Sequence, residues 1–132
     1  MPIHFRNSPV NEPFILDSIG NHWSQDRVLR PKGYPLYHYL HTEKGQGIID
    51  TPGKTYALNE GEGILLAPGL HHTYTKCTEE WLTSFATFTG TIDSSIGKIV
   101  GNRQVIFMEK EQGVLISALI DSIMDDWDML VS

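Results

Sequence analysis

The stretch that most constrains the fold of this chain is residues 61–74, GEGILLAPGLHHTY. Its glycines permit the positive φ angles of tight turns, and its Pro-Gly pair is a typical turn dipeptide. The apolar run between these turns, residues 64–66, suits a short strand buried on both faces. His71 and His72 lead into another strand, so one imidazole should point inward and the other outward.

Similar short segments follow one another along most of the chain. Strands are predicted at residues 34–41, 47–50, 54–58, 64–67, 72–77, 81–89 and 105–108, with a further segment near Ile99. In residues 81–89 either alternating set of side chains is acceptable as the inward set. Segments spaced roughly 8–12 residues apart indicate an all-β sandwich or barrel, here of about eight strands.

The chain divides into three regions by its pattern. Residues 1–21 are polar and contain three prolines, so we expect a movable N-terminal arm with an edge strand near residues 14–16. Residues 22–110 should form the barrel. From residue 111 to 132 the period changes to that of an amphipathic helix, with apolar residues at Ile116, Leu119, Ile120, Ile123, Met124, Trp127, Leu130 and Val131.

The helical stripe is wide enough both to pack on the barrel and to form a dimer seam. An apolar face of that size left in water would favour aggregation. The pattern stops without a capping residue, so we expect the chain to be part of a longer protein. The candidate dimer residues are Leu119, Ile123, Trp127 and Leu130.

Charge and composition exclude several classes of function. The net charge is −6, and residues 111–132 contain no Lys or Arg. Without a basic cluster this chain should not bind nucleic acid by itself. No apolar run is long enough to span a membrane and no signal peptide opens the chain. A single cysteine, Cys77, fits a cytoplasmic protein.

Several motifs in fixed order resemble one known family. They are a strand ending in a Gly-x-Gly turn (residues 37–47), the hairpin strand GKTYAL (residues 53–58), the stretch 61–72, and residues 81–90. Together they resemble the cupin-like N-terminal domain of AraC-type transcriptional regulators. The resemblance implies a cupin-like (jelly-roll) β-barrel that binds a small effector, followed by a helix that mediates homodimerisation. It also implies a DNA-binding domain, which this chain does not contain.

The same resemblance allows a test for metal. Metal-binding cupins use two His and a Glu near one strand and a further His after the Pro-Gly turn. His72 occupies the turn position and His38 falls where the Glu would be, but the His-x-His pair expected near residues 31–34 is missing. Two imidazoles fall short of a usual zinc or iron set. We therefore expect no metal, no other cofactor and no catalytic residues.

Three strand residues are candidates for contact with a ligand. Strand alternation places His72 and Tyr74 on one face. His72 could contact an effector or be a hydrogen-bonded core histidine, and Tyr74 could line a pocket or fill the barrel. His38 lies between two leucines, so a buried imidazole there needs a partner, either a ligand or an internal group. His41 and His71 are expected to be exposed.

Residues 22–32 mix aromatic, imidazole and guanidinium groups. Arg27 and Arg30 could be ordinary surface residues, but a guanidinium also suits recognition of a carboxylate, phosphate or diol. Arg30 is the preferred candidate because it is nearer the first clear strand. Trp23 could form a lid or rim and stack on a ligand, whereas Trp81 favours core packing.

The sequence thus predicts a cytoplasmic effector-sensing and dimerisation domain of an AraC-type regulator. The effector would be a small polar molecule, sugar-like or a small acid. It would be bound by Trp23, Arg30, His38, His72 and Tyr74. Two alternatives remain: a metal-dependent cupin enzyme, such as a sugar isomerase or dioxygenase, and a barrel without ligand that serves only for oligomerisation.

Overall fold

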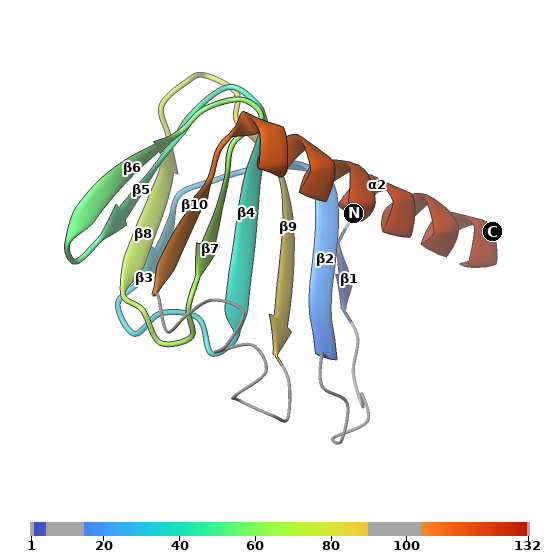
Figure 1. The fold of residues 1–132 in the computed structure, drawn as a ribbon, viewed down its shortest axis with the longest axis horizontal. Helices are drawn as coiled ribbons and strands as arrows, with labels where there is room; N and C mark the ends of the chain where they lie inside the picture. The colour runs from blue at the N-terminus through green and yellow to red at the C-terminus, as the bar shows by residue number, and fades with distance from the viewer. Residues whose placement is uncertain (1, 5–14, 90–103, 132) are drawn as a thin grey trace.

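The computed structural model describes residues 2–4, 15–89 and 104–131, which form two antiparallel sheets and one long helix (Figure 1). The first sheet has six strands in the order β1 (Ile3–His4), β2 (Ile15–Ser24), β9 (Leu82–Thr89), β4 (Tyr37–Lys44), β7 (Gly63–Leu66) and β10 (Val105–Met108). The second has four strands in the order β3 (Val28–Arg30), β8 (His72–Lys76), β5 (Gly47–Thr51) and β6 (Lys54–Leu58).

One part of the hydrophobic core lies between the two sheets. Leu40, Ile64 and Leu66 of the first sheet are fully buried and belong to one cluster with Ile49 and Leu58 of the second. Burial of these aliphatic side chains holds the sheets together, at about 1.5–3 kcal/mol for each fully buried side chain.

Trp81 closes this core at one end. Its indole N–H donates to Thr42 Oγ1 at 2.8 Å, and Thr42 donates to the Leu58 carbonyl at 3.0 Å. Gly47 is required here, because a Cβ at this position would lie 2.1 Å from Cζ2 of the indole. The preference of Trp81 for core packing is confirmed, since the side chain is buried.

A second part of the core lies on the outer face of the six-stranded sheet, beneath helix α2 (Lys110–Val131). Ile120 and Met124 of the helix are buried against Ile19 of β2, Tyr39 of β4 and Leu65 of β7. The first half of α2 crosses this sheet, and the second half extends past β2 and β1 at the sheet edge (Figure 1). The sheet is therefore covered on both faces.

This double cover explains why the inward set of residues 81–89 was ambiguous. Phe85 joins the core between the sheets, whereas Ala86 and Phe88 pack beneath α2. Both alternating sets of side chains in this strand therefore include apolar residues, and each set lies in its own buried environment.

The predicted all-β architecture with a C-terminal helix is confirmed. Its N-terminal boundary differs, because residues 15–21 belong to β2 and lie within the sheet rather than in a separate arm. The short strand β3 was not predicted, and the described part of the chain contains ten strands where about eight were expected. Residues 5–14 and the segment near Ile99 lie outside the described residues.

Candidate functional site

A cavity of about 350 Å³ opens between the two sheets, and we call it the inner cavity. Its wall combines one cation, several polar groups and a run of aromatic and aliphatic surface. The lining residues are Pro2, Ser18, Trp23, Gln25, Val28, Arg30, Tyr34, His38, Tyr74, Phe85 and Thr87.

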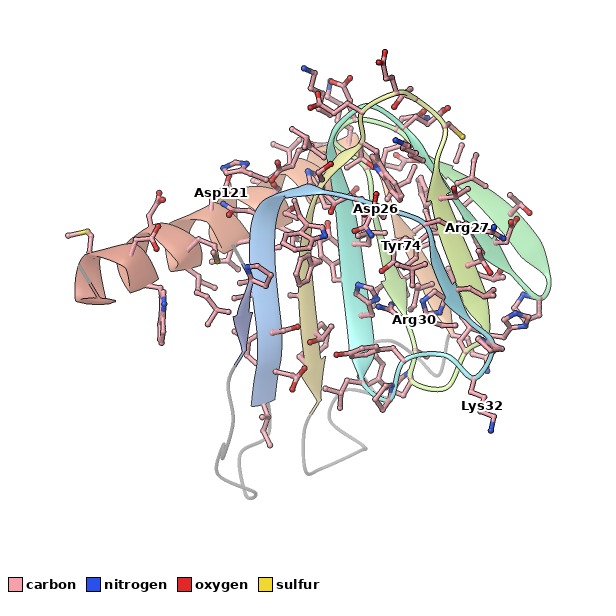
Figure 2. All side chains as sticks on the ribbon, turned by 180° about the vertical axis from the view of Figure 1, so that it is seen from behind. Asp26, Arg27, Arg30, Lys32, Tyr74 and Asp121 are labelled. Atoms are coloured by element: carbon pink, nitrogen blue, oxygen red, sulfur yellow. The ribbon has the colours of Figure 1, made fainter. Side chains whose placement is uncertain are left out.

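Arg30 is the centre of the polar part of this wall. It lies at the end of β3, where its register partner on β8 is His72. Its Nη1 donates to His38 Nδ1 at 2.9 Å and to His72 Nε2 at 3.3 Å. Figure 2 shows Arg30 and Tyr74 between the sheets, whereas Arg27 is exposed and is not part of the cavity wall. The choice of Arg30 over Arg27 therefore agrees with the geometry.

The arginine fixes the tautomers of both histidines. A guanidinium can only donate, so the nitrogens that face it must carry lone pairs. The other ring nitrogen of His72, Nδ1, accordingly donates to the Leu70 carbonyl at 2.9 Å. The internal hydrogen bonds considered for His38 and His72 are thus present, and the two imidazoles hold the guanidinium in place.

Burial and charge keep both imidazoles neutral. Burial, with the charge of Arg30 and the neighbouring His72 adding to it, lowers the pKa of His38 to about 3. Burial also lowers the pKa of His72, although the hydrogen bond to Leu70 opposes this shift. The inner cavity therefore carries the charge of Arg30 without a second cation beside it.

Aromatic rings surround the guanidinium. Its Cζ lies 4.8 Å from the ring centre of Tyr34 and 5.4 Å from that of Tyr74, both cation–π contacts. The Tyr74 ring stacks on His72 with ring centres 5.8 Å apart. Burial raises the pKa of Tyr74, so its hydroxyl stays protonated at neutral pH.

Part of the cavity wall is apolar. Trp23 is 42% exposed at the mouth and meets Phe85 edge to face, with ring centres 6.5 Å apart. Val28 continues this surface. The structure thus brings Trp23 and Arg30 to one cavity, as predicted, and adds Phe85 and Val28, which sequence reasoning did not single out.

No carboxylate within the described residues forms an ion pair with Arg30. The nearby Asp17 accepts hydrogen bonds from Thr87 at 2.9 Å and from Tyr34 at 3.4 Å instead. Arg30 is only partly exposed, so its charge is neither fully hydrated nor neutralised by a described side chain.

Of the five candidate ligand residues, four line the inner cavity: Trp23, Arg30, His38 and Tyr74. The fifth, His72, is buried next to Arg30 and contacts it. Direct contact of these side chains with a ligand stays a prediction. Tyr34 also lines the cavity and was missed, because it was assigned to the start of a strand rather than to the loop before β4.

One surface expectation was wrong. His71 is exposed as predicted, but His41 is only 3% exposed. It lies on the outer face of β4, where α2 covers it. Burial lowers the pKa of His41, and the charges of Glu43 and Asp121 oppose that shift. The strand pattern alone could not show that a helix covers this face.

The inner cavity offers a metal ion poor conditions. The lone pairs of His38 Nδ1 and His72 Nε2 already accept hydrogen bonds from a permanent cation, Arg30. Within residues 2–4, 15–89 and 104–131, the three groups that could share an ion are instead His22, Glu43 and Asp121, outside this cavity.

The candidate dimer residues on α2 have different environments. Leu119 is 62% exposed, but Ile123 and Trp127 pack partly against the core of their own chain. The side chain of Leu130 lies outside the described part. Leu115, at 70% exposed, was not predicted and forms an i, i+4 pair with Leu119.

Comparison with known proteins places this architecture. The family described as the AraC-like ligand binding domain matches residues 16–114. The chain belongs to this family. No curated protein shows significant sequence similarity to this AraC-like domain.

Solved structures of ToxT from Vibrio cholerae resemble this AraC-like domain. One at 1.65 Å resolution has a TM-score of 0.57 and 15% identity over 83% of this chain and 48% of that one. A complex of ToxT with (E)-4-(8-methylnaphthalen-1-yl)but-3-enoic acid has a TM-score of 0.58 and 16% identity, over 85% of this chain and 49% of that one. ToxT with bound unsaturated fatty acid has a TM-score of 0.55 and 10% identity, over 86% of this chain and 48% of that one.

These identities establish the fold and nothing finer. The cupin-like fold predicted from the motifs is confirmed. The chain spans about half the length of the ToxT chains that it matches. Among the residues that the structure describes, no helix combines enough length with enough apolar character to span a lipid bilayer.

Proposed function

We propose that this AraC-like domain senses a small organic acid, whose carboxylate binds Arg30 and whose apolar body lies along Val28, Phe85 and Trp23. The domain would be the effector-sensing part of a cytoplasmic transcriptional regulator. DNA would be bound by a further domain outside this chain. The observation that carries the proposal is a partly buried guanidinium without an ion-pair partner among the described residues.

A carboxylate is the ligand group that best fits Arg30. A guanidinium has five N–H donors and pairs well with the two oxygens of a carboxylate. Only Nη1 is used by the two histidines. Charge-assisted hydrogen bonds contribute about 1.5–3 kcal/mol each. The neutral histidines add no competing charge, and they limit the movement of the arginine, so little ordering is left for binding.

The other wall supports an apolar body for the acid. Trp23, Phe85 and Val28 give the cavity that holds Arg30 an apolar part of its wall, which a sugar would satisfy less well. A cavity of about 350 Å³ is at the small end of ligand sites. The ligands named with the ToxT structures, a fatty acid and an aryl butenoic acid, also combine a carboxylate with an apolar body.

Effector binding would act through populations of states. The ligand would favour one arrangement of sheet, helix and partner subunit over another, and a coupling free energy of about 1–3 kcal/mol gives a 5–150-fold change in DNA affinity. The exposed pair Leu115 and Leu119 on α2 is the proposed dimer seam. Ile123 and Trp127 would support it from below, with Leu130 continuing it.

The test is calorimetric titration with small monocarboxylic acids of aliphatic and aromatic type. Each acid is paired with its methyl ester, and monosaccharides form a second panel. We expect acids to bind at least about tenfold more tightly than their esters, since an ester loses the charged bidentate pair. Arg30→Gln should remove this preference.

The matched control is Arg27→Gln, since Arg27 is exposed and does not line the cavity. It should bind acids as the unchanged chain does. Circular dichroism checks that both variants fold. Esters or sugars that bind as tightly as acids would contradict the carboxylate assignment, as would equal acid affinity in Arg30→Gln and Arg27→Gln.

A further inference from the structure

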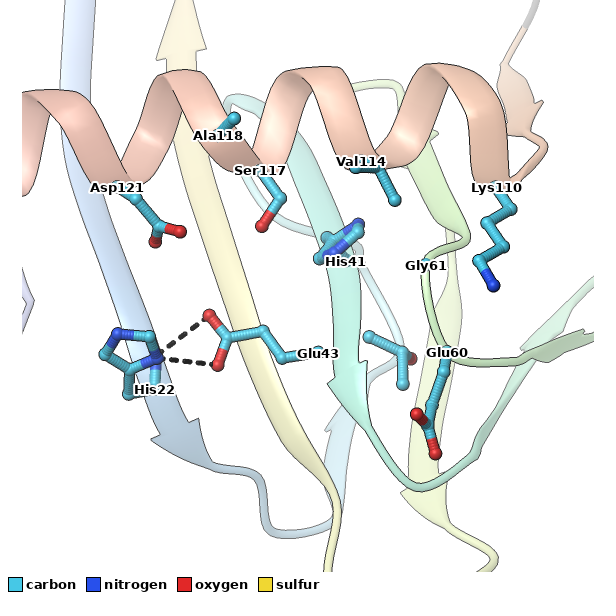
Figure 3. Close-up of a pocket in the computed structure, with 11 residues that line it drawn as sticks. His22, His41, Glu43, Glu60, Gly61, Lys110, Val114, Ser117, Ala118 and Asp121 are labelled. Atoms are coloured by element: carbon cyan, nitrogen blue, oxygen red, sulfur yellow. Dashed lines mark hydrogen bonds and ion pairs between the residues drawn. The ribbon is translucent and has the colours of Figure 1, made fainter.

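A second cavity, of about 450 Å³, lies on the opposite face of the six-stranded sheet, beneath the first half of α2 (Figure 3). We call it the helix pocket. It is lined by His22, His41, Thr42, Glu43, Glu60, Gly61, Lys110, Val114, Ser117, Ala118 and Asp121. Alternation along β4 turns His38 toward the inner cavity and both His41 and Glu43 toward the helix pocket.

A bulge in β2 directs two consecutive side chains toward this pocket. The register between β2 and β9 shifts between Gly20 and Trp23, and His22 has a φ of 52°. Asn21 reaches Asp121 of α2 at 2.8 Å, and His22 reaches Glu43 of β4. A regular strand would have sent these neighbours to opposite faces.

The result is a cluster of metal-binding side chains at one end of the helix pocket. One donor atom each from His22, Glu43 and Asp121 lies within 4.8 Å of the other two. His22 Nδ1 is 2.9 Å from Glu43 Oε1. Figure 3 shows both residues and Asp121 pointing toward one another from β2, β4 and α2.

We propose that His22, Glu43 and Asp121 bind a divalent transition-metal ion of the zinc type. Tetrahedral zinc holds nitrogen and oxygen ligands at about 2.0–2.2 Å, so that ligand atoms are ~3.4 Å apart. The three donors, which lie within 4.8 Å of one another, would have to adjust their side chains to reach this spacing. Imidazole nitrogen and carboxylate oxygen both bind zinc, and two carboxylates would balance its charge.

A separate observation in the same pocket supports the ion. His41 is 3% exposed, and its Nδ1 has no hydrogen-bond partner within the described part of the chain. Buried polar atoms normally have a partner. A water on the open coordination position of the ion would supply one to the His41 ring. The cation already present in the pocket, Lys110, lies at the other end, near Gly61 (Figure 3).

The ion would connect two strands to the helix. Its ligands come from β2, β4 and α2, and it would add to the hydrogen bond between Asn21 and Asp121 and to the packing of α2 on the sheet. The site is separate from the inner cavity, because β4 lies between them. It therefore does not depend on the proposed effector.

The test uses tag-free chain that has been treated with a chelator and dialysed. Titration calorimetry with ZnCl₂ should show one ion bound per chain, and zinc should raise the melting temperature. His22→Asn and Asp121→Asn should each weaken zinc binding at least about tenfold and remove the rise. Asparagine tolerates the positive φ of position 22 and keeps the shape of position 121.

His71→Asn is the matched control, since His71 is an exposed histidine away from the helix pocket. It should bind zinc as the unchanged chain does. Mg²⁺ should bind far more weakly, because imidazole prefers transition metals. Absence of zinc binding by the folded chain would overturn the proposal. So would equal zinc affinity in His22→Asn, Asp121→Asn and His71→Asn.

Discussion

The protonation state of each residue around Arg30 is set by its neighbours. The guanidinium donates to two imidazoles, so each of them must present a lone pair to it. A proton on either ring would place two cations side by side in a buried site. The arrangement thus links the position of the arginine to the neutrality of His38 and His72.

This arrangement predicts acid sensitivity. In the folded chain the pKa of His38 is lowered from 6.5 to about 3, whereas in the unfolded chain it returns to about 6.5. The unfolded chain therefore binds an extra proton below pH 6.5. The contribution of a neutral His38 is complete above pH 6.5 and is lost as the pH falls toward 3, at up to about 1.4 kcal/mol per pH unit.

Urea unfolding at pH 7.5 and pH 5.0 measures this loss. His38→Gln keeps an acceptor for Arg30 but does not titrate, so it should lose less stability between the two values than the unchanged chain. The difference that remains includes His72 and His41, whose pKa values burial also lowers. An equal loss in both chains would contradict the assignment to His38.

The sequence was most informative where a residue type conflicted with its position. His38 stands between leucines in a strand, and Arg30 stands in a mixed segment next to one. His38 therefore suggested either an internal partner or a ligand, and Arg30 suggested a ligand. His41 gave no such signal, because nothing in β4 itself shows that a helix will cover its outer face.

At the scale of elements, the start of α2 is fixed by close contact with the turn before β7. Gly61 has a φ of +88°, which favours glycine. A Cβ on Gly113 of the helix would lie 2.0 Å from the carbonyl oxygen of Gly61. The backbone of the helix therefore approaches the turn more closely than any side chain would allow.

Gly113→Ala should accordingly destabilise the domain. Replacing glycine by alanine inside a helix normally stabilises by about 1 kcal/mol, but here the backbone must shift, as in other overpacked positions that cost about 1–3 kcal/mol. Urea unfolding measures the change. Gly53→Ala is the control, because a Cβ there has no described atom within 4 Å. A more stable Gly113→Ala chain would refute this contact.

Elements were predictable where the pattern is regular. Residues 54–58 and 105–108 form β6 and β10 at the predicted bounds. β3 was missed because three residues pairing with β8 are too few to show a period. Residues 15–21 of β2 were predicted to belong to an arm because the segment is polar. In the structure, polar side chains of this segment instead form hydrogen bonds to a neighbouring strand and to α2.

At the scale of the whole molecule, α2 serves both the core and the surface. Its residues Ile120 and Met124 are buried against the sheet, whereas its residues Leu115 and Leu119 remain 70% and 62% exposed. The order of motifs in the sequence was sufficient to predict the architecture. It could not separate these two faces, because both lie within one wide apolar stripe.

The exposed pair predicts an interface between subunits. Leu115→Asp/Leu119→Asp should shift the domain from dimer to monomer, as measured by light scattering over a range of concentrations, with little change in its melting temperature. Gly53→Asp/Ala57→Asp adds the same charge at exposed positions of the β5–β6 hairpin, away from α2, and should leave the assembly unchanged. A dimer that persists with both leucines replaced would place the interface elsewhere.

β4 has almost no side that faces water. Five consecutive residues, His38 to Thr42, are buried, and they alternate between the space between the sheets and the face that α2 covers. Such a strand has little freedom to vary in sequence, since a change at any of these positions disturbs one packed layer or the other. In a saturation-mutagenesis library selected for folding, β4 should therefore accept far fewer substitutions than β6. Three of the five residues of β6 are exposed, all but Tyr56 and Leu58.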